Sequence, residues 1–291
     1  MPSPPAADAE RPAATTGGTL AALPRHAQPS AAFVDPEPAL PQGHDDVLSA
    51  EMVAAWHANG WLLVDGVLPA GLVAAAAADG AAIYPTPSGS NGTAEQLASS
   101  GRLRLGDGGN SVSTDFPYNS RALNQVVVHP RMLRAVEQLL ATDDIRLTQA
   151  GFGAKYGLAA GKSRKDEDGR FPAGGGQPHH MDYGFNTLLV PPARPEAVAT
   201  ITYFTEMDPA SEASGDSGAT ALSPGPMILT DAGGVDHTEP EGVYQTEVLG
   251  RFRPGTVLLY RMDFWHRGTP LRVGAVRRTS HIVWRRADAE W

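Results

Sequence analysis

Two adjacent histidines and an aspartate stand within four positions in the stretch PHHMDYGF, residues 178–185. Side chains alternate between the two faces of a β-strand, so His180 and Asp182 would point one way and His179 the other. A His-x-Asp pair supplies two thirds of the 2-His-1-carboxylate set that holds non-haem Fe(II) and leaves coordination positions open. The pattern predicts His180 and Asp182 as metal ligands, with His179 as the alternative to His180 and a second histidine supplied from elsewhere.

The second histidine is predicted to be His266, which ends the apolar segment GTVLLYRMDFW just before a turn containing Gly and Pro. Strands that are distant in sequence can be neighbours in a β-sandwich, so the separation from Asp182 is no obstacle. Arg277 follows at the start of RRTSHIVW. Its guanidinium could bind a carboxylate through two parallel hydrogen bonds, as a dicarboxylate cosubstrate beside the metal would require. Arg278 is the alternative, because a shift of one residue exchanges the two faces of a strand.

Composition narrows the class of protein. The chain has 291 residues, of which 42% are hydrophobic, and one β-sandwich or barrel domain can account for that length. A formal net charge of −9 opposes a nucleic-acid partner. The chain has no cysteine, which excludes thiolate metal sites, disulfides and cysteine nucleophiles. No signal peptide or membrane-spanning run is recognisable, so we expect a cytoplasmic protein with a small-molecule substrate and no membrane partner.

The elements that would position these residues fall into two parts. Residues 1–43 are rich in Pro, Ala and Ser, which predicts a disordered tail before one domain over residues 44–291. Ser49 is a suitable N-cap and Gly60 a suitable C-terminal residue for a first helix. Apolar spacing predicts two further helices, in PAGLVAAAAADGAAI and HPRMLRAVEQLLA, and a short strand in WLLVDGVL.

From Ile145 onward the pattern changes to short apolar or alternating runs separated by Gly and Pro clusters. These runs are IRLTQAGFGAKYG, EAVATITYFTEM, GTVLLYRMDFW and RRTSHIVW. Runs of this length and spacing are typical of β-strands. The sequence therefore predicts a mainly β core behind a helical N-terminal part.

With these residues in order, the chain resembles the phytanoyl-CoA dioxygenase-like family of Fe(II)/2-oxoglutarate-dependent oxygenases. The resemblance covers residues 47–288 and rests on His180-x-Asp182, SGDSGATALSPGPM at 214–227 and HRGTPLRVGAVRR at 266–278. The opening LSAEMVAAWHANGWLLVDGVLP is similar to the helix and strand with which the family begins. The end of the middle segment, SPGPM, departs from the family's usual Pro-Gly-Ser-His-like motif, which affects a loop contact and not the metal ligands.

The resemblance implies a double-stranded β-helix, or jelly roll, with N-terminal helices packed on one sheet. It implies that His180, Asp182 and His266 bind Fe(II), and that 2-oxoglutarate chelates the iron while its distal carboxylate pairs with Arg277. Lys155 and Thr202 would line the cosubstrate pocket. The implied reaction uses O2, releases succinate and CO2, and hydroxylates an unactivated carbon. Halogenating relatives replace the carboxylate ligand by a small residue, so Asp182 argues against halogenation.

Two other functions stay open at this point. A cupin-like metal enzyme that does not use 2-oxoglutarate, such as an isomerase or a cosubstrate-independent dioxygenase, would make the arginine incidental. A non-catalytic β-sandwich binding module would make the whole ligand set a coincidence. The substrate is equally open among acyl thioesters, amino-acid-like compounds and natural-product intermediates. The Gly-rich connection at 162–176 is interpreted either as a solvated loop or as a lid over the substrate.

Overall fold

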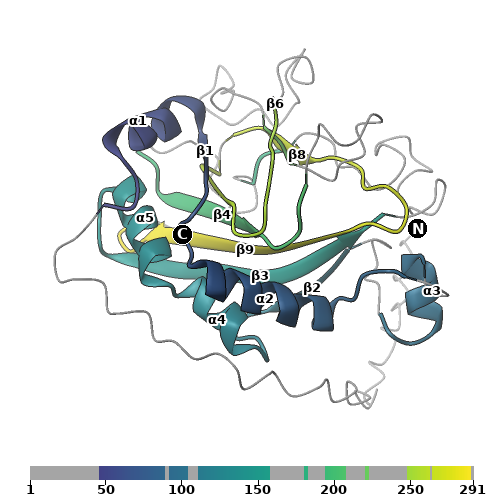
Figure 1. The fold of residues 1–291 in the computed structure, drawn as a ribbon. Coiled ribbons are helices and arrows are strands. Elements are labelled where there is room, and N and C mark those ends of the chain that lie inside the picture. Colours follow the sequence, from purple (N-terminus) through teal and green to yellow (C-terminus); the bar gives the residue numbers. More distant parts are fainter. Residues whose placement is uncertain are drawn as a thin grey trace, which may run out of the picture.

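The large sheet that carries most of the predicted strands is visible across the middle of Figure 1. The computed structural model describes residues 46–88, 92–103, 111–157, 180–182, 194–207, 220–222, 248–262 and 264–289. The predicted tail at 1–43 and the predicted lid at 162–176 lie outside these ranges. Within the described ranges, no helix combines the length and the apolar character that crossing a bilayer would need.

Two antiparallel sheets are formed by the described residues. The large sheet has the order β1-β7-β4-β9-β3-β2 and the small one β6-β5-β8, and Figure 1 shows the small sheet above the large one. In sheet order, the strands are β1 (Trp61–Val64), β7 (Val257–Tyr260), β4 (Ala197–Tyr203), β9 (Val276–Arg286), β3 (Ile145–Tyr156), β2 (Ser111–Asp115), β6 (Val248–Leu249), β5 (Thr220–Leu222) and β8 (His266–Gly268).

Helices α2 (Ala70–Ile83) and α4 (Arg121–Val127) lie on the face of the large sheet opposite the small sheet, and α5 (Pro130–Leu140) lies at the left end of the sheet (Figure 1). The helix α1 (Ala50–Asn59) lies beside β1, and the short helix α3 (Ala94–Ser99) lies at the right of this view. The Ser49 side chain accepts from the amide of Met52 and Gly60 adopts a left-handed φ of 84°, so both predicted ends of the first helix are confirmed. The other two predicted helices are α2 and α5.

Sequence reasoning missed the two shortest helices, α3 and α4. Thr93 and Gln96 form a reciprocal capping box at the start of α3, and Ser120 caps α4 by accepting from the amide of Leu123. These capping residues were the available signal. Helices of 6 and 7 residues are too short to establish an apolar period, because one face receives only two or three side chains.

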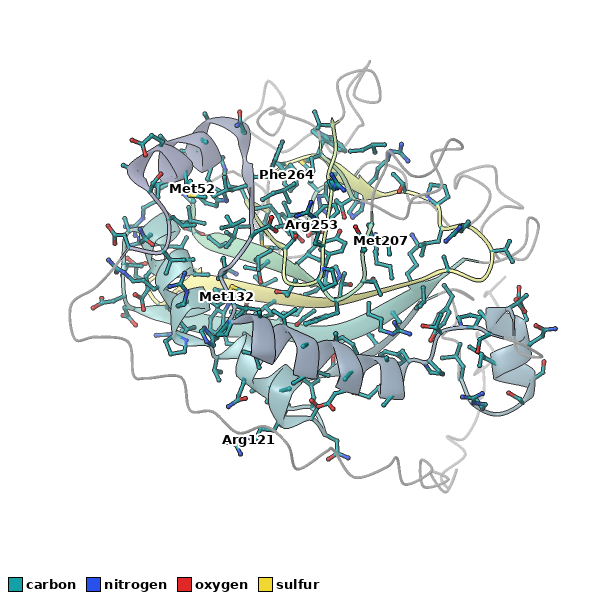
Figure 2. All side chains as sticks on the ribbon, in the orientation of Figure 1. Met52, Arg121, Met132, Met207, Arg253 and Phe264 are labelled. Atoms are coloured by element: carbon teal, nitrogen blue, oxygen red, sulfur yellow. The ribbon has the colours of Figure 1, made fainter. Side chains whose placement is uncertain are left out.

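The central strands β7, β4 and β9 are buried on both faces, so the large sheet separates two hydrophobic cores. On β4, Val198 belongs to the cluster beneath the helices, whereas Ala199 and Ile201 belong to the cluster between the two sheets. Figure 2 shows both layers of side chains, with Met132 on the helix side and Phe264 between the sheets. The predicted jelly roll with helices on one sheet is therefore confirmed.

Candidate metal centre and the strand face beside it

His180 and His266 lie side by side although 85 residues stand between them in the sequence. The amide of His180 donates to the carbonyl of His266 over 2.9 Å, and the amide of His266 donates back over 3.0 Å. The centroids of their imidazole rings are 4.4 Å apart. This isolated antiparallel bridge places the predicted first and second histidine ligands on neighbouring backbone segments.

Asp182 completes a cluster of three possible metal ligands. One carboxylate oxygen, Oδ1, lies 3.9 Å from Nε2 of His180, and the other, Oδ2, lies 3.7 Å from Nε2 of His266. One donor atom from each residue lies within 4.8 Å of the other two. Imidazole and carboxylate ligands bind an ion such as zinc at about 2.0–2.2 Å, so donors on one ion are at most about 4.4 Å apart. The two distances between the Asp182 carboxylate and the histidine nitrogens, 3.9 and 3.7 Å, lie within this limit.

Two neighbouring groups orient these ligands. The Tyr260 hydroxyl donates to Asp182 Oδ2 over 2.7 Å. Nδ1 of His266 lies 3.3 Å from the carbonyl oxygen of Phe264, and a hydrogen on Nδ1 leaves the lone pair of Nε2 directed at Asp182. The Phe264 ring stacks on the His266 ring with centroids 5.0 Å apart. Sequence reasoning missed Tyr260, because a tyrosine at the end of the apolar run VLLY looks like an ordinary core residue.

The surroundings keep Asp182 ionised and Tyr260 protonated. Burial by itself raises the pKa of Asp182, but His266, the hydrogen bond from Tyr260 and His180 outweigh burial and the net pKa is lowered. Burial, and then the charge of Asp182, raise the pKa of Tyr260 well above its ordinary value. The pair therefore acts as a hydrogen-bond donor and an anionic acceptor at neutral pH.

Alternation along β9 decides which of its side chains face the metal cluster. Tyr203 and Ile201 of β4 belong to the core between the sheets, and their register partners on β9 are Thr279 and His281. Paired residues on adjacent antiparallel strands point to the same face. Thr279 and His281 therefore face the space between the sheets, and Arg277, two residues before Thr279, faces it too.

Arg278 points to the opposite side of the large sheet. Its Nε donates to the carbonyl of Tyr84 over 2.6 Å, and its Nη2 donates to Oγ1 of Thr86 over 2.7 Å. Both acceptors follow α2, on the helix side. The structure thus places Arg277 on the same side as the metal cluster and uses Arg278 to fasten the chain after α2 to the sheet.

Lys155 stands directly opposite Arg277 in the pairing of β3 with β9. Both side chains are buried, with 7% and 8% of their surface exposed. Burial, and then the charge of Arg277, lower the pKa of Lys155 well below its ordinary value. Among the described residues, Nζ of Lys155 has no hydrogen-bond partner. Two basic side chains therefore lie next to one another on the face directed between the sheets, and their surroundings disfavour the charged form of Lys155.

Thr202 lies on the helix side of the large sheet and not on the side of the metal cluster. The predicted alternation of side chains along β4 is therefore wrong by one residue. The register partner of Thr202 is Ser280, which also pairs with Phe152 of β3, and Phe152 belongs to the core beneath the helices. Thr202 is fully buried there. Sequence reasoning could not fix the alternation, because both faces of β4 are buried and neither carries a consistently polar set of side chains.

His281 is a further titratable group on the inner face of β9. Its Nε2 lies 2.9 Å from Oγ1 of Thr279. Burial, and then the charge of Arg277, lower the pKa of His281 to about 4, while Asp182 opposes the shift. The His281 imidazole is therefore neutral at neutral pH. Sequence reasoning assigned His281 no role.

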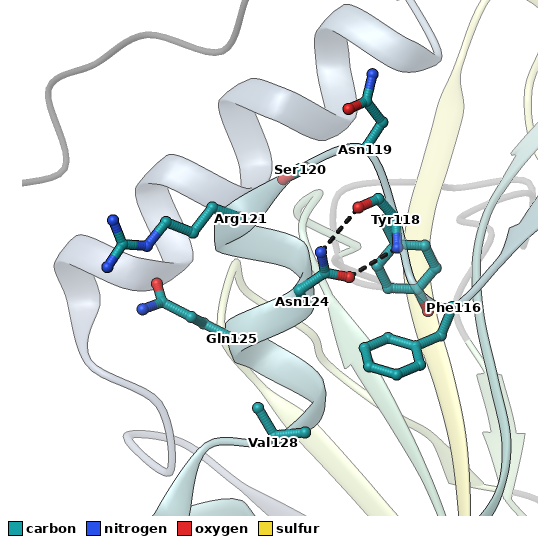
Figure 3. A pocket seen from close by; sticks show the side chains of 8 residues that line it. All are labelled: Phe116, Tyr118, Asn119, Ser120, Arg121, Asn124, Gln125 and Val128. Carbon is teal, nitrogen blue, oxygen red and sulfur yellow. Dashed lines mark hydrogen bonds between the residues drawn. The ribbon is translucent and has the colours of Figure 1, made fainter.

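A shallow pocket of about 360 Å³ lies elsewhere, along α4 and the loop before it (Figure 3). Its wall is fixed by Asn124, whose side chain accepts from the Tyr118 amide over 2.7 Å and donates to the Tyr118 carbonyl over 2.8 Å. Arg121, Gln125 and Val128 line it as well. None of the three candidate ligands belongs to this pocket, so it is separate from the metal cluster.

Among the comparisons with known proteins, the one with solved structures identifies the fold. No protein-family model matches the chain, and no curated protein matches it. The solved structure of SnoN, described as a non-haem α-ketoglutarate-dependent epimerase from nogalamycin biosynthesis, superimposes with a TM-score of 0.56 at 18% identity, over 81% of this chain and 82% of that one.

Two further structures superimpose equally well. EctD from S. alaskensis gives a TM-score of 0.58 at 17% identity, covering 83% of this chain and 78% of that one. AviO1 from Streptomyces viridochromogenes gives 0.55 at 16% identity, covering 84% and 98%. The chain therefore has the jelly-roll fold found in non-haem 2-oxoglutarate-dependent enzymes such as SnoN. Its candidate metal centre lies where a residue of the small sheet, His266, and one of the large sheet, Tyr260, both approach Asp182.

Proposed function

We propose that the protein is an Fe(II)- and 2-oxoglutarate-dependent oxygenase that hydroxylates a small molecule. The observation that carries this proposal is the convergence of His180, Asp182 and His266, which supply two imidazoles and one carboxylate within 4.8 Å of one another. This donor set suits Fe(II), and three protein ligands leave coordination positions open for other molecules. Bound Fe(II) would supply the activation of O2, with 2-oxoglutarate oxidised to succinate and CO2 and a substrate carbon hydroxylated.

The protein's own contribution begins with orienting the ligands. Asp182 would compensate part of the metal charge, and the contact of His266 Nδ1 with the Phe264 carbonyl would direct Nε2 to the metal. His266 is buried, so bulk water has little access to this side of the site. Limited access protects an oxidising reaction from side reactions with solvent.

The two basic side chains on the inner face of the large sheet support binding of a dianionic cosubstrate. Arg277 would pair bidentately with the distal carboxylate of 2-oxoglutarate, and Lys155, its cross-strand partner, would add a second positive charge. Burial and the charge of Arg277 disfavour the charged form of Lys155, and a carboxylate between the two side chains would favour it again. His281 interacts electrostatically with both Arg277 and Asp182, which supports a cosubstrate lying between the arginine and the metal.

Related folds support a small organic substrate. A SnoN structure is described in complex with Fe3+, α-ketoglutarate and nogalamycin RO, and an EctD structure with 2-oxoglutarate and 5-hydroxyectoine. SnoN is described as an epimerase, so this fold also serves reactions other than hydroxylation. We favour hydroxylation over halogenation because Asp182 supplies the carboxylate ligand. Halogenating members of the phytanoyl-CoA dioxygenase-like family lack this ligand.

The proposal is tested without knowing the substrate. Anaerobic Fe(II) with 2-oxoglutarate should give a weak visible charge-transfer band, and admission of O2 should give slow formation of succinate. His266→Ala should lose both signals, because the metal retains only two protein ligands. His57→Ala is the matched control, since His57 is exposed on α1 and its loss should leave both signals intact. A wild-type protein that carries iron but gives neither signal would point instead to a cupin-like enzyme that does not use 2-oxoglutarate.

A further inference from the structure

Tyr260 occupies a fixed position between the large sheet and the candidate metal centre. It ends β7, whose neighbours are β1 on one side and β4 on the other, and its register partners are Trp61 and Ala199. The ring is buried, and its centroid lies 5.2 Å from that of Phe264. A hydroxyl on such a side chain has little freedom to move, because the strand that carries it is paired along both edges.

Asp182 has much less support of its own. It lies in a bend that follows the isolated bridge at His180, outside the regular strands. Among the described residues, Tyr260 alone donates a hydrogen bond to the Asp182 carboxylate, over 2.7 Å to Oδ2. The orientation of the carboxylate therefore depends on a side chain from the opposite sheet.

We propose that Tyr260 is a positioning residue that holds Asp182 Oδ2, so that the carboxylate presents Oδ1 to the metal and occupies one coordination position. This inference rests on the proposed function, because it concerns the metal that the proposed function requires. An oxygen that accepts a short hydrogen bond from a phenol is a weaker metal ligand, since one of its lone pairs is engaged. Holding the carboxylate in this way would keep other positions on the metal free for cosubstrate and O2.

The test measures binding of Co(II) alone, without cosubstrate or turnover. Loss of a hydrogen-bond partner behind a metal ligand typically weakens metal binding about 10- to 100-fold. We therefore expect Tyr260→Phe to raise the Co(II) dissociation constant about 10-fold or more. Tyr156→Phe is the matched control, because Tyr156 is equally buried and its hydroxyl donates to the Pro85 carbonyl on the helix side.

A double-mutant cycle separates positioning from a general effect on folding. If Tyr260 acts through Asp182, then Tyr260→Phe in an Asp182→Ala background should change the Co(II) dissociation constant by less than about twofold. An equal weakening in both backgrounds, an equal weakening in Tyr156→Phe, or unchanged binding in Tyr260→Phe would each overturn the inference. If the wild-type protein binds no divalent metal, both the proposed function and the role of Tyr260 are overturned. If the wild-type protein binds Co(II) tightly and one of the three outcomes above is observed, only the role of Tyr260 is overturned.

Discussion

The Arg277→Ala variant tests whether the buried guanidinium on β9 binds the distal carboxylate of 2-oxoglutarate. Only 8% of Arg277 is exposed, so its pair with a carboxylate would be largely desolvated. Removing one partner of such a charge-assisted pair costs about 2–5 kcal/mol. Lys155 stays opposite the substituted position and can still donate a hydrogen bond to a carboxylate there, which favours the lower half of that range. We expect a loss of about 2–3 kcal/mol, or about 30- to 150-fold in the dissociation constant of 2-oxoglutarate.

The adjacent Arg278→Ala variant is the matched control, because it removes the same side chain from the opposite face. Arg278 donates two hydrogen bonds, to the Tyr84 carbonyl and the Thr86 hydroxyl. Hydrogen bonds from a charged group contribute about 1.5–3 kcal/mol each. This variant should lose about 3 kcal/mol or more of unfolding free energy and bind 2-oxoglutarate nearly as well as the wild-type protein.

Calorimetric titration of 2-oxoglutarate into anaerobic, Fe(II)-loaded protein measures the first quantity, and urea unfolding of the metal-free protein measures the second. We expect Arg277→Ala to be impaired in cosubstrate binding and Arg278→Ala to be impaired in stability. The opposite pattern would refute the assignment of the two faces of β9. Equal loss of cosubstrate affinity in both variants would refute a specific pair with Arg277.

Three further predictions concern residues around the same strands. The pKa of His281 is near 6.5 in the unfolded chain and about 4 in the folded protein. The contribution of His281 to the free energy of unfolding should therefore be complete above pH 6.5 and be lost as the pH falls to 4, by an amount on the order of 3 kcal/mol. Urea unfolding at several pH values measures this loss, which should disappear in His281→Gln. Lys155→Met should weaken 2-oxoglutarate binding in the same calorimetric assay, by less than Arg277→Ala does, and unchanged affinity would remove Lys155 from the subsite. Thr202→Val should leave that affinity unchanged and alter unfolding free energy by no more than about 1 kcal/mol, because Oγ1 of Thr202 has no hydrogen-bond partner among the described residues; a large loss of affinity would contradict the face on which Thr202 lies.

Local signals in the sequence were sufficient for the elements that position the site. Ser49 and Gly60 marked the ends of the first helix, and the long apolar runs marked β3 and β9. These features are readable because helix caps and strand runs depend on residues that are close in sequence. The short helices α3 and α4 were missed because a single turn or two carries little periodic signal.

The candidate site was predictable only in part. His180 and Asp182 were recognisable as a pair because their spacing is local, and the structure brings His266 beside them. The role of all three as iron ligands remains a prediction that the metal titrations address. Thr202 was placed on the wrong face, because β4 is buried on both sides and its residue types do not distinguish the helix side from the inner side.

The sequence by itself determined the residue types, the local pairs and the kind of element in which each one lies. Tertiary structure decided the relations between distant strands, which no local spacing encodes. It set the register that places Lys155 opposite Arg277, directed Arg278 to the chain after α2, and brought Tyr260 from one sheet to Asp182 beside the other. These relations follow from how two sheets and a layer of helices pack around two cores, and packing depends on the whole set of side chains at once.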